Sequence, residues 1–343
     1  MSASLYARGG GGVTVMSFSL RRSISLVAVA VLLLSGSGCG DSGDSSTGAT
    51  VVGQQTVDSR TLDLVISSPA LGTTAGVRLL LPPDWAAEPT RRCPVLYLLH
   101  GARAVPDGES TNYQSWTSNT DVEELTATTD VLVVMPEGGN VGWYSDWYND
   151  GRGGPPAWET FHLTELRAIL EEGYRAGGER AIAGLSMGGF GAASYAARHP
   201  GMFRAVASYS GALTTIPAAA QVIVRGSLVL QGFDPNALWG DPSAQLQIWQ
   251  EHDPYSLAEQ LVGIPVFVSA GNGNPGPLDA PGTRFDALEQ AVLQSAQAFS
   301  ANLAGLGGDV TTDLYGAGTH SWPYWQQELH RSFPLLMSAI GAS

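Results

Sequence analysis

The pentapeptide Gly184-Leu185-Ser186-Met187-Gly188 constrains the fold of this chain more than any other stretch. The short apolar run 180–183 precedes it, and an alanine-rich run that ends at Pro200 follows it. These flanks predict a buried strand, a tight turn and a helix. Such a turn, called a nucleophile elbow, holds a serine in a strained backbone conformation that only small neighbours can pack around. The pattern therefore predicts that Ser186 is a nucleophile; the alternative is an ordinary glycine turn.

Strands and helices are expected to alternate along the rest of the chain. Apolar or alternating runs predict strands, and longer periodic runs predict helices. The alternation predicts an α/β-hydrolase fold, with a mostly parallel central sheet and helices on both faces. The expected strands are 60–67, 77–81, 94–99, 131–136, 203–208, 264–270 and 310–314; the expected helices are 158–171, 189–200, 283–303 and 322–340; and 212–262 is expected to be an irregular, mixed helical insertion.

The first 38 residues are predicted to be a signal peptide. Two arginines, Arg21 and Arg22, precede the apolar run 24–34. This run is too short to span a bilayer and has the length of a signal-peptide core. Met16 is an alternative start, because the residues before it add nothing that a signal requires. The sequence therefore predicts an exported protein.

Cys39 follows small residues, as in a bacterial lipoprotein signal, in which this cysteine is lipidated and becomes the mature N-terminus. Gly36 departs from that pattern, so plain secretion stays open as an alternative. Residues 39–58 are expected to be a flexible tether, because they begin with a run of Ser, Gly and Asp, and 59–343 to be one catalytic domain. The other cysteine, Cys93, stands just before a predicted strand and is expected to be a buried structural thiol.

Composition excludes several functions. All 17 basic residues are arginine, which excludes a Schiff-base lysine and a phosphate-binding P-loop lysine. The net charge of −14 argues against a nucleic-acid partner. No histidine pair has the spacing of metal ligands on one helix, so neither a metal nor another cofactor is expected.

A serine nucleophile requires a general base, and the base requires a carboxylate that orients it. In α/β-hydrolases these partners follow the nucleophile, on loops after late strands. Of six histidines, His320 alone lies in the turn after the last predicted strand, which makes it the candidate base; otherwise it is a surface loop histidine. The candidate acids are Asp279, Asp286, Glu289 and Asp313, and position alone favours Asp279 or Asp286.

Two backbone N–H groups are the candidate donors to the oxyanion of the reaction. One belongs to Met187, directly after the serine, and the other to Ala102, in the loop after the strand that ends at His100-Gly101. In this position His100 is expected to be a structural residue of the turn.

Several stretches together resemble the antigen 85 group of secreted mycolyltransferases, within the esterase D-like α/β-hydrolases. The resemblance covers roughly residues 75–340. The stretches that carry it are Leu99-His100-Gly101-Ala102-Arg103, Tyr144-Ser145-Asp146-Trp147-Tyr148, Trp158-Glu159-Thr160-Phe161, Gly184-Leu185-Ser186-Met187, Gly271-Asn272-Gly273 and Thr319-His320-Ser321-Trp322-Pro323-Tyr324-Trp325.

The resemblance implies a Ser–Glu–His triad in which Glu289 is the acid, in place of the aspartates that position favours. It implies the same oxyanion donors, Ala102 and Met187, and it implies that Arg103 binds substrate. Ser321 and Trp322 match the family's contacts to the acyl acceptor.

Two departures concern the acceptor. His100 and Thr214 stand where the family has aspartates that contact trehalose, which counts against trehalose as the acceptor in this protein. Acyl-enzyme chemistry is not affected. The sequence therefore predicts a serine-dependent acyltransferase of the cell envelope, which moves an acyl group to a sugar or lipid alcohol. The alternative is a carboxylesterase with water as the acceptor; a non-catalytic envelope binding protein is the third interpretation. A lipidated N-terminus would associate the protein with a membrane.

Overall fold

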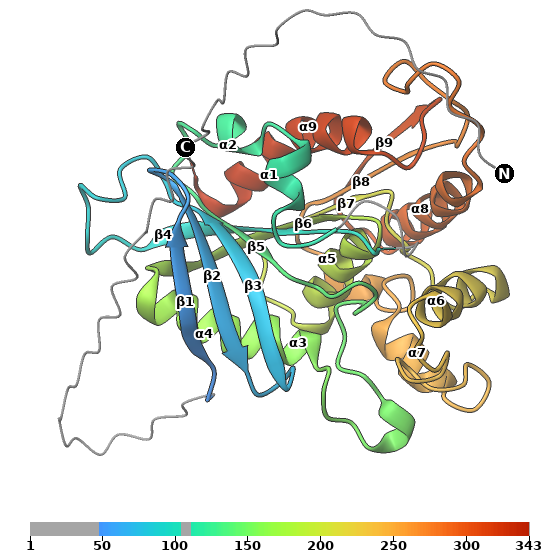
Figure 1. The fold of residues 1–343 in the computed structure, drawn as a ribbon. Helices are drawn as coiled ribbons and strands as arrows, with labels where there is room; N and C mark the ends of the chain where they lie inside the picture. Colours follow the sequence, from blue (N-terminus) through green and yellow to red (C-terminus); the bar gives the residue numbers. More distant parts are fainter. Residues whose placement is uncertain (1–47, 104–110, 343) are drawn as a thin grey trace, which may run out of the picture. The chain divides into compact units, whose positions relative to one another are not determined.

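The computed structural model describes residues 48–103 and 111–342, whose strands form one nine-stranded sheet (Figure 1). Their order in the sheet is β1-β2-β3-β5-β4-β6-β7-β8-β9. The bounds are β1 Thr50–Thr56, β2 Thr61–Ser68, β3 Thr73–Leu80, β4 Cys93–Leu99, β5 Leu132–Pro136, β6 Ala176–Leu185, β7 Ala205–Tyr209, β8 Val266–Gly271 and β9 Val310–Gly316.

The sheet changes direction at β5. Strands β1, β2, β3 and β5 pair antiparallel, whereas every pair from β5 through β4 and β6 to β9 is parallel. Strands β4 to β8 have almost only buried residues, as expected for strands covered on both faces, except at the start of β6. The mostly parallel sheet of the α/β-hydrolase fold is thus confirmed.

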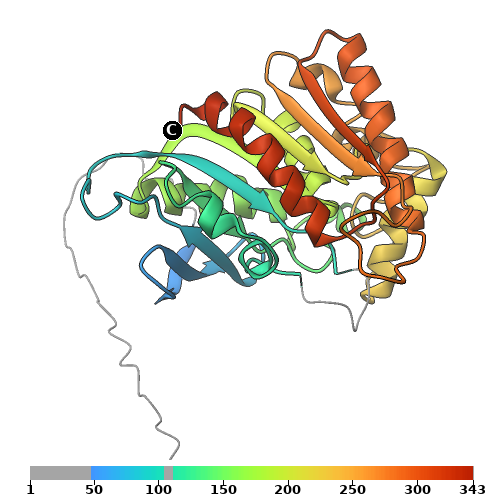
Figure 2. The same cartoon turned by 90° about the horizontal axis from the view of Figure 1, so that it is seen from above.

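Helices cover both faces of the sheet (Figures 1 and 2). Side chains of α4, α5 and α8, among them Leu170, Phe190 and Phe299, pack on one face. Side chains of α1, α2 and α9, among them Trp116 and Leu336, pack on the other. The bounds are α1 Ser115–Asn119, α2 Val122–Leu125, α3 Trp158–Thr160, a π-helical segment Phe161–Leu166, α4 Arg167–Gly173, α5 Met187–Arg198, α6 Ala218–Leu230, α7 Leu246–His252, α8 Ala287–Gly305 and α9 Trp322–Ile340.

Most predicted elements are present with shifted ends. The helix expected at 158–171 is the run from α3 to α4, and the insertion 212–262 contains α6, α7 and a short 3-10 helix. The helix expected from residue 283 begins at Ala287, because the side chain of Asp286 caps it by accepting hydrogen bonds from the N–H groups of Leu288 and Glu289. The short helices α1 and α2 were not predicted.

The predicted tether 39–58 is wrong in its second half. Thr50–Thr56 form β1, the edge strand, which pairs with β2. The side chains of β1 are almost all exposed, so the strand is held by backbone hydrogen bonds and has no apolar pattern to reveal it. The first part of the tether, the signal peptide and Cys39 lie outside the described residues.

Residues 46–343 form one compact unit of the chain. Both clusters of buried apolar side chains lie within it, between Leu62 and Ile340. We therefore expect this unit to fold on its own. Within the part that the structure describes, no helix is both long enough and apolar enough to cross a bilayer.

Candidate active site

Ser186 lies at the turn between β6 and α5, as the sequence predicts. Its backbone has φ +54° and ψ −120°, a conformation that is costly for any residue with a side chain. A Cβ on Gly184 would lie 2.2 Å from the Gly188 carbonyl oxygen, and one on Gly188 would lie 2.3 Å from the Leu99 carbonyl oxygen. Both glycines are therefore required for the close packing that holds Ser186 in this conformation.

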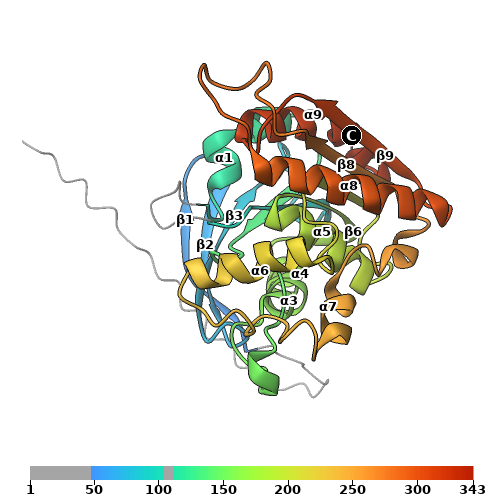
Figure 3. The same ribbon diagram turned by 90° about the vertical axis from the view of Figure 1, so that its right-hand side faces the viewer.

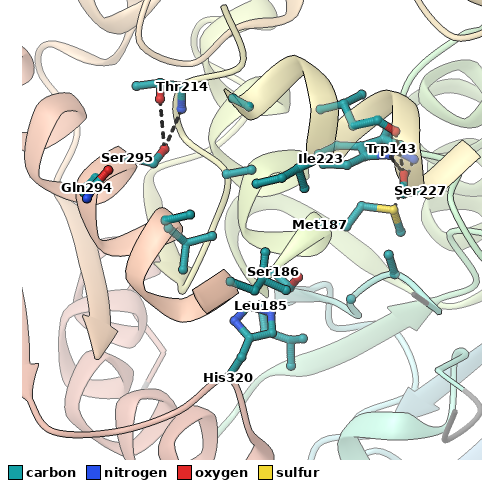
Figure 4. Close-up of a pocket in the computed structure, with 18 of the residues that line it drawn as sticks. Trp143, Leu185, Ser186, Met187, Thr214, Ile223, Ser227, Gln294, Ser295 and His320 are labelled. Carbon is teal, nitrogen blue, oxygen red and sulfur yellow. Dashed lines mark hydrogen bonds between the residues drawn. The ribbon is translucent and has the colours of Figure 1, made fainter. Parts of the chain in front are cut away.

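Ser186 and His320 lie beside each other at the edge of one cavity, as Figure 4 shows. His320 comes from the loop after β9, and its Nε2 is buried without a hydrogen-bond partner among the described residues. A neutral Nε2 with a free lone pair can accept a proton from a hydroxyl group. The two side chains are thus placed as a nucleophile and its base would be.

Glu289 and His320 form a close pair. The Nδ1 atom of His320 lies 2.6 Å from Oε2 of Glu289, whose side chain is fully buried in the first turn of α8. A carboxylate accepts and does not donate, so it fixes the proton of the imidazole on Nδ1. This leaves Nε2 as the acceptor on the side of Ser186.

Three further groups bind Glu289, all through Oε1. They are the backbone N–H of Gly271 at 2.6 Å, the hydroxyl of Ser210 at 2.8 Å and the phenol of Tyr315 at 3.3 Å. Burial, followed by the charge of Glu289, raises the pKa of Tyr315 far above its usual range, so the phenol stays protonated and donates. The indole N–H of Trp325 in turn donates to Ser210.

The sequence did not predict these hydrogen-bond partners of Glu289. Ser210 directly follows β7 and has φ +49°, so it resembles Ser186 in standing at a strand end with a left-handed backbone. The only signal for it was a small residue beside Gly211 at the carboxyl edge of the sheet. That signal does not distinguish a support from a turn.

Each of the three candidate aspartates is bound elsewhere. Asp286 caps α8 with Oδ1, and its Oδ2 accepts a hydrogen bond from the backbone N–H of His320. Asp279 binds Thr319, Tyr324 and the backbone N–H of Gly276. Asp313 pairs with Arg331 on the outside of the sheet. The structure therefore brings Glu289, and none of these aspartates, to the imidazole ring of His320.

The candidate oxyanion donors also line the cavity next to Ser186. Met187 is the first residue of α5, so its N–H has no partner within the helix. Ala102 follows Gly101, where a Cβ would lie 3.3 Å from the Cβ of Ser186, so the backbone of this loop passes directly beside the nucleophile. Both residues thus lie beside Ser186, where the donors of an oxyanion hole would have to be.

His100 is buried below this loop. Its Nε2 accepts a hydrogen bond from the backbone N–H of Gly138, and its carbonyl accepts one from the hydroxyl of Tyr144. The imidazole therefore joins the loop of Ala102 to the loop after β5. His100 is engaged in these backbone contacts and is not among the residues that line the cavity.

The cavity has a volume of about 900 Å³ and its wall is mostly apolar. Helices α6 and α8 both contribute to this wall, with Ile223 and Val292 among the lining side chains. The residues expected to bind substrate, Arg103, Ser321 and Trp322, all line it. A volume of this size has room for an acyl chain, since even a water molecule occupies only about 30 Å³ in the liquid.

A polar end of the cavity lies away from Ser186 (Figure 4). There the backbone N–H and the hydroxyl of Thr214 both bind Ser295 Oγ, at 2.7 and 3.2 Å. The carboxylate of Asp253 also lines the cavity, but four hydrogen bonds from Thr215 and Ser256 already engage it. The end of the cavity around Thr214 thus offers neutral hydroxyl groups in place of a free carboxylate.

Comparisons with known proteins agree with this geometry. The family model described as putative esterase matches residues 68–336. The diacylglycerol acyltransferase/mycolyltransferase Ag85B of Mycobacterium intracellulare is 34% identical over 264 residues, which cover 73% of this chain and 76% of that protein. The Mycobacterium tuberculosis esterase Rv1288 is 38% identical over 167 residues, which cover 48% of this chain and 35% of that protein.

Solved structures share the fold. The crystal structure of MPT51 (FbpC1) from Mycobacterium tuberculosis has a TM-score of 0.66 and 28% identity, over 81% of this chain and 97% of that chain. The fluorophosphonate-binding serine hydrolase FphF of Staphylococcus aureus has a TM-score of 0.61 and 19% identity, over 80% of this chain and 97% of that chain. At that identity the second similarity concerns the fold alone.

Proposed function

Because this chain belongs to the putative esterase family, and within it to the antigen 85 mycolyltransferase group, we propose that it is a serine-dependent acyltransferase of the cell envelope. The observation that carries the proposal is the pair of the buried Glu289 and His320, whose free Nε2 lies beside Ser186 in the wall of an apolar cavity. The proposed donor is an acyl ester, and the proposed acceptor is a sugar or lipid alcohol.

In the proposed acylation, Ser186 Oγ attacks the carbonyl carbon of the ester and its proton passes to His320 Nε2. The N–H groups of Met187 and Ala102 hold the negative charge of the tetrahedral oxygen. Glu289 stabilises the positive imidazolium that forms. When the intermediate collapses, the bond to the leaving alcohol breaks and that alcohol takes the proton from Nε2. The acyl group is now bound to Ser186.

Deacylation repeats these steps with a second alcohol. His320 Nε2 takes the proton of the acceptor hydroxyl, whose oxygen attacks the acyl carbon. The returning tetrahedral intermediate releases Ser186 Oγ, which recovers its proton from the imidazolium. The same machinery with water in place of the alcohol is a carboxylesterase, which is the second candidate function.

Two observations separate the candidates. The apolar cavity and the acyltransferase names of the curated relatives favour transfer. His100 and Thr214, which replace the acidic sugar contacts of the family, count against trehalose and are compatible with a lipid alcohol or water. The third interpretation, a non-catalytic binding protein, does not explain why a base with a free lone pair lies beside a strained serine.

We also propose that the protein is exported and that Cys39 carries lipid. The signal-peptide pattern of residues 1–38 supports this proposal. Mass spectrometry of the protein from its native membrane would detect a diacylglyceryl group on Cys39, and a soluble product without lipid would contradict the assignment.

The activity can be tested with residues 46–343 and a p-nitrophenyl acyl ester. Release of p-nitrophenol and the acylated products would be followed with trehalose, glycerol, a monoacylglycerol or no acceptor, and Ser186→Ala as the control. An acylated alcohol in excess over free acid establishes transfer and identifies the acceptor class. Free acid at a rate indifferent to alcohols establishes the esterase. No turnover dependent on Ser186 would contradict both functions for this class of donor.

A further inference from the structure

Helix α6 exposes large apolar side chains on its outer surface. Val222, Val229 and Leu230 of the helix, and Phe233 just after its end, have exposed fractions of 71%, 55%, 56% and 46%, and the helix lies at the periphery of the fold (Figures 1 and 3). At about 100° per residue, Val222 and Val229 project within about 20° of one another, while Leu230 projects about 80° from Val222, on the side of Ile223. These four side chains are called the α6 patch below. Isolated exposed apolar residues are normal, but a cluster of this kind marks an interaction surface.

The inner side of α6 is apolar as well. Ala219, Ala220, Ile223 and Val224 line the cavity that contains Ser186, and none of them belongs to the patch. Ile223 is also exposed at 36%, so apolar surface continues around the helix from the patch to the cavity. A helix that is apolar on both sides normally has a partner on both sides. The cavity accounts for the inner side only.

The segment that carries the α6 patch is poor in negative charge. The run 218–233 contains Arg225 and no Asp or Glu, in a protein whose net charge is −14, and the exposed Asp234 follows this run. An acidic protein repels an anionic surface, so a segment without carboxylates is the place where such a surface can approach. This charge does not favour a second copy of the chain, because two copies with a net charge of −14 each repel one another.

We propose that the α6 patch docks on a lipid surface, with the acyl donor reaching the cavity around α6 without crossing water. The proposal rests on the proposed function for its purpose, because only an acyl-lipid substrate gives such docking a use. The length of the chain before the domain permits it: residues 39–49, fully extended, reach about 35–40 Å, while a domain of this size has a radius of gyration of about 19 Å. A domain anchored at Cys39 can therefore turn α6 toward the same membrane.

The test is binding to vesicles of phosphatidylcholine with or without phosphatidylglycerol, measured by flotation. It uses residues 46–343 with Ser186→Ala, so that no turnover is required and a failure of the proposed function does not affect the result. The variant Val222→Asp/Val229→Asp is expected to lower the fraction bound by about tenfold or more. The control Val52→Asp/Leu306→Asp adds the same charges at apolar side chains of similar exposure and is expected to bind as the parent does.

A second measurement does not alter the patch charge. Val222→Cys and Leu306→Cys, each labelled with a polarity-sensitive fluorophore, report whether that position enters the lipid. A blue shift on vesicle addition at residue 222 and none at residue 306 supports the proposal. No vesicle binding by the parent protein, equal loss in both double variants, or a monomer released from a dimer by Val222→Asp/Val229→Asp with vesicle binding unchanged would each overturn it.

Discussion

Glu289 shows how one residue can be buried and charged at the same time. Its carboxylate accepts hydrogen bonds from a backbone N–H, a serine, a tyrosine and His320, which together replace the water that it loses. Asp286, one helical turn earlier, binds the backbone of the same histidine. One carboxylate thus positions the loop and the other orients the ring.

Glu289→Gln is expected to lower kcat on a p-nitrophenyl ester by about 10³- to 10⁴-fold, because the amide neither fixes the proton on Nδ1 nor stabilises the imidazolium. Thermal unfolding of the variant shows whether it is folded. Asp313→Asn, at the surface pair with Arg331, is the matched control and should keep its activity. An activity of Glu289→Gln close to that of the control would remove this residue from the proposed triad.

Glu328 on α9 is also a buried carboxylate, but it has fewer hydrogen-bond partners than Glu289. Arg331 and Gln327 bind Oε1, while Oε2 has no partner in the described part of the chain. Burial raises the pKa of Glu328 to about 7. Its favourable contribution to stability is therefore present below its ordinary pKa near 4.5 and is lost as the pH rises through 7.

Glu328→Gln is therefore expected to gain stability over the natural protein at pH 8.5, because glutamine stays neutral, and to show no such gain at pH 5.5. Urea midpoints at both pH values measure the effect. Glu179→Gln, at an exposed pair with Arg204, should show no comparable pH dependence. The same difference in midpoint at both pH values would mean that ionisation of Glu328 does not matter to stability.

Elements differ in how much of them the sequence could predict. The elbow was predictable because its glycines are required by backbone contacts of two to three ångströms, which leave no choice of residue. Strand β1 was not, because its side chains face solvent and its register comes from pairing with β2. The choice of Glu289 over Asp286 depended on resemblance, since a helix cap and a triad acid both belong at the start of the same helix.

Gly184→Ala tests the elbow as an element. The added Cβ would lie 2.2 Å from a backbone oxygen that cannot move away, so we expect a loss of about 3 kcal/mol in the free energy of unfolding. Activity should fall with it, since Ser186 would be displaced. Gly178→Ala, earlier in β6, has open space around its Cβ and should change neither property. Equal behaviour of the two variants would contradict this account of the elbow.

The whole molecule is expected to be sensitive to acid through two buried histidines. Burial lowers the pKa of His162 and of His252 to about 4. A lowered pKa means that the unfolded chain binds protons first, so stability is complete above pH 6.5, the ordinary histidine pKa, and falls as the pH drops toward 4.

Each of these histidines is expected to remove up to about 3 kcal/mol of stability over this pH range. Urea unfolding at pH 7 and pH 4.5 measures the loss, and His252→Gln should reduce it. His330→Gln, where the imidazole is exposed beside Asp121, should not. A variant at residue 252 that retains the full pH dependence would exclude this histidine as a cause.

The order of the chain separates chemistry from selectivity. Ser186, Glu289 and His320 follow β6, β8 and β9, while α6 and α7 and much of the cavity wall come from the single insertion between β7 and β8. Under the proposed function, an exchange of this one segment would change the acyl group accepted without rebuilding the proposed reaction centre. The insertion can also be exchanged by protein engineering. When the segment that corresponds to residues 212–262 is moved from one relative into another, we expect the donor preference to move with it.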